Sequence, residues 1–247
     1  MRHFFPSKAA KLLRLLSKAG YARGLRYGVA ATIEHEDVMR ALTPGTLVDV
    51  GANKGQFSLL ARTLHPDLLI HAFEPLSAPA RRYRRLFSHQ QNVHLHPIAA
   101  GEASATAEIH VSGRADSSSL LPITDLQDKL FPGTAQASVE TVRIERVDDI
   151  LSEAALADPI LVKLDVQGYE LAALKGMPKL LARARHVYAE VSFQELYEGQ
   201  PLAHEIIAWL ASRGFRISGA YNPSIAGSGA AIQADLLFSK IDETAPL

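Results

Sequence analysis

Short apolar runs alternate with longer segments of helical periodicity along most of the chain after residue 45. The runs have the length of buried strands and end at polar or glycine-containing turns, whereas the segments between them repeat apolar residues at helical spacing. Strands that alternate with helices predict an α/β fold with a mostly parallel sheet and right-handed crossovers. The predicted strands are 46–50, 68–73, 93–98, 160–164, 186–191, 215–218 and 232–238.

The middle of the chain has a different pattern, in which apolar and polar residues alternate. This alternation, over 105–111 and 139–144, is typical of strands with one solvated face. The two stretches flank a polar loop that contains the serine run 117–119. We therefore expect an antiparallel insertion between the third and fourth parallel strands. Since no repeat or linker interrupts the rest, we predict one domain over 45–247, preceded by a helical extension over 1–44.

The predicted extension is strongly basic. It carries seven lysines and arginines and no acidic residue as far as Ile33, and four leucines, Leu12, Leu13, Leu15 and Leu16, recur among them at helical spacing. This pattern predicts a basic amphipathic helix. We expect the leucines to pack on the main domain and the cations to face water. The alternative is peripheral contact with a membrane or another polyanion.

Composition removes several classes of protein from consideration. The 247 residues are 47% hydrophobic, and 26 basic side chains balance 26 acidic ones. This balance argues against a nucleic-acid partner, which needs a basic excess. The sequence has no cysteine, so thiolate metal sites and a cysteine nucleophile are excluded. Because neither a secretory signal nor a membrane-spanning run is found, we expect a cytoplasmic protein.

The strongest chemical signal is the turn after the first predicted strand. Gly51 and Gly55 allow a tight bend around Asn53 into a helix, whose N-terminus favours a carboxylate. Glu74, 23 positions after Gly51, ends the second strand, where a carboxylate accepts both hydroxyls of a ribose. Asp49 precedes the turn; it would repel a diphosphate but suits an ammonium group. A ligand with a ribose and an amino-acid head fits best, and S-adenosylmethionine is such a ligand.

The sequence resembles the FkbM-type family of S-adenosylmethionine-dependent methyltransferases. The resemblance covers residues 46 to about 240, and the block around Lys163 and Asp165 is its most specific part. The matching blocks are 48–56, 73–75, 99–102, 117–120, 147–151, 163–170, 190–193 and 197–201.

This resemblance implies a Rossmann-like class I methyltransferase fold with a mostly parallel seven-stranded sheet and a reversed last strand. It also implies S-adenosylmethionine as cofactor and methyl transfer to oxygen on a small-molecule or glycan-like acceptor. Two other functions remain open. One is a nicotinamide-dependent oxidoreductase on the same sheet, which the spacing of Gly51 and Gly55 disfavours. The other is a noncatalytic module that binds an adenosyl ligand or a partner.

A hydroxyl acceptor must lose a proton, so we expect a general base at the carboxyl edge of the sheet. Asp165, at the end of the fourth strand, is the first candidate; its alternatives are a contact to the cofactor amine and helix N-capping. Lys163 lies on the same strand face and could pair with Asp165 or contact the acceptor. Glu190 places a charge near the sheet interior, where it needs a partner or a function. Asp165 and Glu190 could also bind a divalent ion, but no third ligand is evident and we predict no metal.

Other contacts are expected from the resemblance and from residue type. Ala100 leaves room for a flat adenine ring. Ser118 and Ser119 are expected in a lid over the acceptor, and Tyr197 is expected to stack on a sugar or aromatic ring of the acceptor.

Overall fold

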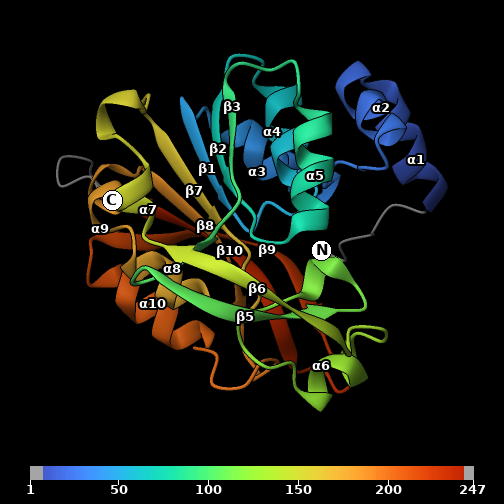
Figure 1. Ribbon diagram of the computed structural model, residues 1–247, viewed down its shortest axis with the longest axis vertical. Coiled ribbons are helices and arrows are strands. Elements are labelled where there is room, and N and C mark those ends of the chain that lie inside the picture. Colours follow the sequence, from blue (N-terminus) through green and yellow to red (C-terminus); the bar gives the residue numbers. More distant parts are fainter. Residues whose placement is uncertain (1–7, 242–247) are drawn as a thin grey trace.

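The central feature of the fold is a seven-stranded sheet with the order β3-β2-β1-β7-β8-β10-β9. The computed structural model describes residues 8–241, and for residues 8–12 and 153 it describes the backbone alone (Figure 1). All neighbouring strands are parallel except β10, which is antiparallel to both β8 and β9. The strands are β1 (Thr46–Val50), β2 (Leu69–Phe73), β3 (Val93–His96), β7 (Ile160–Leu164), β8 (His186–Ser192), β9 (Phe215–Ile225) and β10 (Ala231–Lys240).

This topology confirms the predicted fold class, including the reversed last strand. Several strand boundaries differ from the prediction, and two of the differences change the description of the sheets. The third strand ends at His96, and Ala99–Ala100 forms the separate strand β4. Strand β9 runs well beyond residue 218; it lies at the edge of the sheet and is largely exposed, so its sequence lacks the apolar run of an interior strand.

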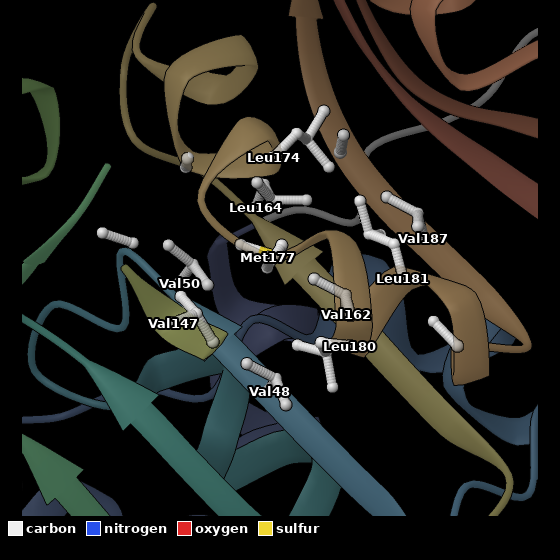
Figure 2. Packing of buried hydrophobic residues seen from close by; sticks show 14 of the residues in the cluster. Val48, Val50, Val147, Val162, Leu164, Leu174, Met177, Leu180, Leu181 and Val187 are labelled. Carbon is white, nitrogen blue, oxygen red and sulfur yellow. The ribbon is translucent and has the colours of Figure 1, made fainter. Parts of the chain in front are cut away.

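Strands β1 and β7 lie at the centre of the sheet, and every residue in them is buried. On one face, Val48 and Val50 of β1 pack with Val162 and Leu164 of β7 against helices (Figure 2). On the other face the pleat places Leu47 and Leu161, but also Asp49 and Lys163. Asp49 and Lys163 thus form a buried charged pair on neighbouring strands, next to the apolar pair Leu47 and Leu161 on the same face.

Helices cover both faces of the sheet (Figure 1). Those on the valine face include α8 (Glu170–Lys175), α9 (Pro178–Arg183) and α10 (Ala203–Ala211), and those on the opposite face come from the extension and from the first two crossovers. The remaining helices are α1 (Lys8–Ser17), α2 (Ala19–Arg26), η1 (Ile33–His35), α3 (Glu36–Ala41), α4 (Gln56–Leu64), α5 (Ser77–Leu86), η2 (Ala115–Ser117), α6 (Asp125–Leu130), α7 (Val147–Ile150) and η3 (Glu153–Ala155). Among residues 8–241, no helix combines the length and apolar content required to cross a bilayer.

The predicted antiparallel insertion is also present. Strand β5 (Ala105–Ser112) pairs antiparallel with β6 (Gln136–Glu145), and β4 adds a third, parallel strand. The segment between β5 and β6 carries η2, the serine run and α6.

The extension packs less completely than expected. Leu15 is buried, but Leu13 is 69% exposed and Leu16 is 56% exposed; the side chain of Leu12 lies outside the described part. The packing prediction is therefore correct for Leu15 and wrong for Leu13 and Leu16, because α1 lies at the outer side of α2 and presents only one edge to it (Figure 1). Peripheral membrane contact stays a prediction.

Glu36 connects the helices of the extension through ion pairs. Its carboxylate is 1% exposed and pairs with Arg14 at 2.9 Å, with Arg40 at 2.6 Å and with Lys18. Burial alone would raise the pKa of Glu36, but hydrogen bonds from Lys18 and Arg40 and the nearby charge of Arg14 lower it. Arg14 and Lys18, two of the seven cations before Ile33, therefore bind an acid of α3 instead of only facing water.

We expect Glu36→Gln to lower the free energy of unfolding by about 1–3 kcal/mol, because three cations lose a common partner. Since the folded-state pKa lies below the ordinary value of 4.5, this contribution is present above that pH and is lost as the pH falls through the folded value. Urea denaturation at pH 7 and pH 4 measures both effects. Asp37→Asn, an exposed acid on the same helix, is the control; an equal loss in both variants would contradict the role of Glu36.

Candidate active site

A cavity of about 300 Å³ lies at the carboxyl edge of the sheet, where the ends of β1, β2, β7 and β8 meet the insertion and η1. Open α/β sheets bind their ligands at this edge. The cavity brings together most of the predicted site residues: Gly51, Asn53, Glu74, Ala100, Ser118, Ser119, Lys163, Asp165 and Glu190. Asp49, Gly55 and Tyr197 are not among its lining residues.

The glycine turn is fixed by close backbone packing. Gly51 has φ +81°, and a Cβ there would lie 1.8 Å from the carbonyl oxygen of Asp165, so no other residue fits. Gly55, with φ +91°, begins helix α4 and packs against Tyr83 and Phe87. The turn thus brings the ends of β1 and β7 into contact. Gly55 does not line the cavity; it packs against the aromatic rings behind it.

Glu74 and Asn53 form one side of the cavity. The Glu74 carboxylate accepts the backbone N–H groups of Asn53 and Leu76, each at 2.8 Å. Burial raises the pKa of Glu74 to about 7, although these hydrogen bonds act in the opposite direction. Asn53 Oδ1 is buried and, within the described residues, has no hydrogen-bond partner. Because Asn53 lines the cavity, this oxygen is a candidate acceptor for a donor group of a ligand.

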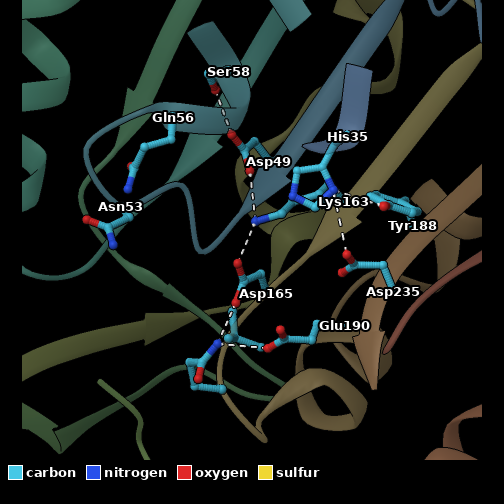
Figure 3. A network of polar contacts seen from close by, with 12 residues as sticks. His35, Asp49, Asn53, Gln56, Ser58, Lys163, Asp165, Tyr188, Glu190 and Asp235 are labelled. Carbon is cyan, nitrogen blue, oxygen red and sulfur yellow. Dashed lines mark hydrogen bonds and ion pairs between the residues drawn. The ribbon is translucent and has the colours of Figure 1, made fainter. Parts of the chain in front are cut away.

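Lys163 is the centre of a charge network beneath the cavity (Figure 3). Its Nζ lies 3.6 Å from Asp49 Oδ1 and 3.2 Å from Asp165 Oδ2. Burial alone would lower the pKa of Lys163, but the two carboxylates outweigh it and raise the pKa. The fully buried Asp49 also accepts the hydroxyl of Ser58 at 2.6 Å. Asp49 therefore contacts Lys163 and Ser58 and does not itself reach the cavity surface.

Asp165 and Glu190 approach one another, as the sequence suggested, but through an amide. Gln167 Nε2 donates to Asp165 Oδ1 at 2.6 Å and to Glu190 Oε2 at 2.9 Å. Gln233 Nε2 donates to the same Glu190 oxygen at 3.2 Å. Burial and the neighbouring carboxylates raise the pKa of Glu190 well above its ordinary value. This shift favours the protonated, uncharged form of Glu190.

The residues predicted to contact the acceptor have structural partners. Ser119 Oγ donates to the carbonyl of Gln167 at 2.6 Å, and Ser118 Oγ accepts the N–H of Ser112 at 3.1 Å. Tyr197 is fully buried, and its hydroxyl donates to Gln167 Oε1 at 2.6 Å. A stacking contact between Tyr197 and an acceptor does not agree with this burial. Tyr197 instead fixes the amide that joins Asp165 and Glu190.

The sequence did not single out several residues of the site. His35 and Thr32 line the cavity from the N-terminal extension, and Gln127 lines it from α6. Gln167 and Gln233 connect the carboxylates. Gln167 lies inside a recognised block and has φ +54°, whereas His35 belongs to no motif and offered no signal.

The strand order, with its antiparallel strand β10, is that of a Rossmann-like class I methyltransferase fold. The model of the methyltransferase FkbM domain matches residues 49–217. The chain therefore belongs to the FkbM methyltransferase family and is an S-adenosylmethionine-dependent methyltransferase.

Curated relatives agree with this family. The chain is 30% identical to 2-O-methyltransferase NoeI of Sinorhizobium fredii, over 78% of this chain and 82% of the relative. It is 28% identical to 31-O-demethyl-FK506 methyltransferase FkbM of Streptomyces tacrolimicus, over 76% and 79%. Among solved structures, precorrin-6y C5,15-methyltransferase from Geobacter metallireducens matches 98% of this chain and 92% of its own at 11% identity, with a TM-score of 0.45.

We expect Lys163→Met to lower the free energy of unfolding by about 3–5 kcal/mol, because it leaves Asp49 buried without a counter-charge. Adding Asp49→Asn should recover most of this loss, since the amide still accepts the Ser58 hydroxyl. Urea denaturation at neutral pH measures both steps. Lys179→Met, at an exposed position of α9, is the control. A loss below 1 kcal/mol for Lys163→Met would contradict the ion pair.

Proposed function

We propose that the protein methylates a hydroxyl oxygen of a small, hydroxyl-rich acceptor such as a sugar or a polyol-bearing natural product. The observation that carries this proposal is the cavity itself, in which a cofactor side and a side rich in titratable groups adjoin across Lys163 and Asp165. The names of the two curated relatives, both O-methyltransferases, support the same acceptor atom.

The residues on the cofactor side fit S-adenosylmethionine. Glu74 offers a carboxylate for the two ribose hydroxyls, and the unpaired Asn53 Oδ1 offers an acceptor for the amino-acid head. Ala99 and Ala100 leave space for a flat ring beside Phe73. When bound, the cofactor supplies a methyl group activated on a sulfonium. The chain's own task is then to align the acceptor oxygen, exclude water and remove the hydroxyl proton.

Further polar residues of the cavity lining suit an acceptor with several hydroxyls. Gln127 Oε1 and Thr32 Oγ1 are buried, and no partner for either is found among the residues that the structure describes. Both residues line the cavity. Since an unpaired buried polar group is costly, hydroxyl groups of a ligand are the natural partners. Arg114 and Asp116 also line the cavity and form an exposed charged pair.

The acceptor class is tested by release of S-adenosylhomocysteine from S-adenosylmethionine in the presence of methyl glycosides, macrolide alcohols and amino-sugar glycosides. We expect turnover with hydroxyl acceptors and a methyl ether in the product by mass spectrometry. Methylation restricted to the amines would overturn the oxygen assignment. A thermal shift with NAD and none with S-adenosylhomocysteine would favour an oxidoreductase.

Glu74→Gln should weaken binding of S-adenosylhomocysteine by about 10–100-fold, because an amide replaces the charge-assisted acceptor of the ribose. In the unchanged protein a carboxyl with pKa about 7 is protonated below that pH, so the Kd should rise about tenfold from pH 8 to pH 6. Glu74→Gln should remove this pH dependence.

Isothermal titration calorimetry measures both effects. Glu102→Gln, at an exposed position near the cavity, should bind as the unchanged protein does. Equal affinity in the Glu74 and Glu102 variants would remove Glu74 from the cofactor site.

A further inference from the structure

The charge of the chain is strongly polarised, although its sum is zero. Residues 1–101 carry 14 lysines and arginines and 6 aspartates and glutamates, a net charge of +8. Residues 102–247 carry 12 lysines and arginines and 20 aspartates and glutamates, a net charge of −8. The balance therefore conceals a basic part and an acidic part. A basic surface attracts an anionic partner even where the whole protein has no excess of cations.

Three helices of the basic part share one core. Leu15 of α1, Tyr21 of α2 and Leu86 of α5 belong to the same buried cluster. Arg23 of α2 also donates to the carbonyl oxygen of Leu86, at 3.2 Å, so α2 and the end of α5 are neighbours. Figure 1 shows α1, α2 and α5 on one flank of the molecule, away from α8, α9 and α10. The outer faces of the three helices thus belong to one side of the protein.

The outer face of α5 consists largely of arginine side chains. The helix carries four arginines, all of them exposed: Arg81, Arg82, Arg84 and Arg85. The sequence has no acidic residue between Glu74 and Glu102. Within residues 8–241, no ion pair is found for any of the four, nor for Arg26, which is exposed on α2. The charge of these five arginines is therefore not neutralised by the part of the protein that the structure describes.

The ion pairs of Glu36 leave a further positive excess at the same helices. Arg14 of α1, Lys18 before α2 and Arg40 of α3 share its single carboxylate. Three cations against one anion give this group a net charge of +2. The carboxylate is buried, whereas the side chain of Arg14 is about half exposed. Glu36 thus stabilises the extension without removing its positive charge.

Helix α1 adds apolar side chains to this charged side. Leu13 and Leu16 are both exposed, and they lie on one face of the helix because they are three positions apart. Arg14 and Ser17, which follow them in the sequence, are exposed as well. A helix that presents leucines to water among cations is typical of a segment that lies in the headgroup region of a bilayer.

We propose that the outer faces of α1, α2 and α5 form a docking surface for a bilayer with anionic headgroups. Arg26 and the arginines of α5 contact the lipid phosphates, and Leu13 and Leu16 insert among the lipids. Nucleic acid is another polyanion that binds arginines, but phosphate contacts of that kind give the exposed leucines no role. This inference goes beyond the proposed function, because none of these residues lines the cavity.

Vesicle binding tests the electrostatic attraction. At about 0.1 M salt the protein should co-sediment with phosphatidylcholine vesicles that contain about 30% phosphatidylglycerol, and not with phosphatidylcholine alone. Binding should be lost at about 0.5 M salt, because the attraction of exposed charges is screened. Equal binding to both kinds of vesicle, or binding to neither, would overturn the proposal.

A pair of arginine substitutions locates the contact. Arg84→Gln with Arg85→Gln should weaken binding to the anionic vesicles about 30-fold, because each cation near such a surface contributes about fivefold. Lys179→Gln with Arg216→Gln, at exposed positions of α9 and β9, changes the net charge equally and is the control. An unchanged Tm verifies that each variant is folded. An equal loss of binding in both variants would contradict the proposed location.

A pair of leucine substitutions distinguishes a bilayer from nucleic acid. Leu13→Ser with Leu16→Ser should weaken vesicle binding about tenfold or more, because the apolar side chains no longer insert among the lipids. Ile225→Ser, at an exposed position of β9, should bind vesicles as the unchanged protein does. If the leucine variant keeps full affinity for vesicles, and the protein binds duplex DNA more tightly than vesicles, the partner is nucleic acid and the proposal is wrong.

Hydrogen exchange of the unchanged protein gives a readout that needs no substitution. On anionic vesicles the backbone amides of α1 should exchange several-fold more slowly, because docking limits their opening and their contact with water. The amides of α8, α9 and α10, on the other face of the sheet, should exchange at the same rate with and without vesicles. Protection of these three helices without protection of α1 would place the contact on the opposite face and overturn the proposal.

Discussion

The ammonium group of Lys163 is the charge on which the arrangement of the site depends. It is almost fully buried in the centre of the sheet, and it would be strongly unfavourable there without Asp49 and Asp165 on either side. Asp49 in turn accepts the Ser58 hydroxyl, and Ser58 accepts the hydroxyl of Tyr83 at 2.9 Å. A chain of polar contacts therefore links β7 through β1 to helices α4 and α5. Any change in the position of Lys163 would be transmitted to both sides of the cavity.

The acidic residues of the protein differ in chemistry because their surroundings differ. Glu36, with three cations around it, has a lowered pKa and serves as a structural ion pair. Glu74 is buried with two backbone donors and has a pKa of about 7, which leaves its carboxylate available as an acceptor above that pH. Burial and the neighbouring carboxylates raise the pKa of Glu190, which favours its protonated form. Divergent pKa values among neighbouring groups are the basis on which acid and base roles are assigned.

The sequence predicted the parts of the fold that depend on continuous local patterns. Strands 46–50 and 160–164 agree with the structure residue for residue, because central parallel strands are buried on both faces. The helix predicted after the glycine turn is also present, and Gly55 is its N-cap. The length of β9 was not predictable, since its exposed residues lack an apolar pattern. Tyr197 was misplaced because an aromatic residue in a loop gives no indication of whether its ring faces a cavity or the core.

His35 shows the other limit of sequence reasoning. Its partners Tyr188, Asn222 and Asp235 lie between 153 and 200 positions further along the chain, and only the packing of the extension against strands β8, β9 and β10 brings them together. The residues that fit the cofactor all precede residue 101, whereas the acceptor side draws on both ends of the chain. We infer that the extension is part of the active site and not an appendage to it. The residues that fit the cofactor therefore come from one continuous part of the chain, whereas those on the acceptor side are brought together only by the tertiary fold.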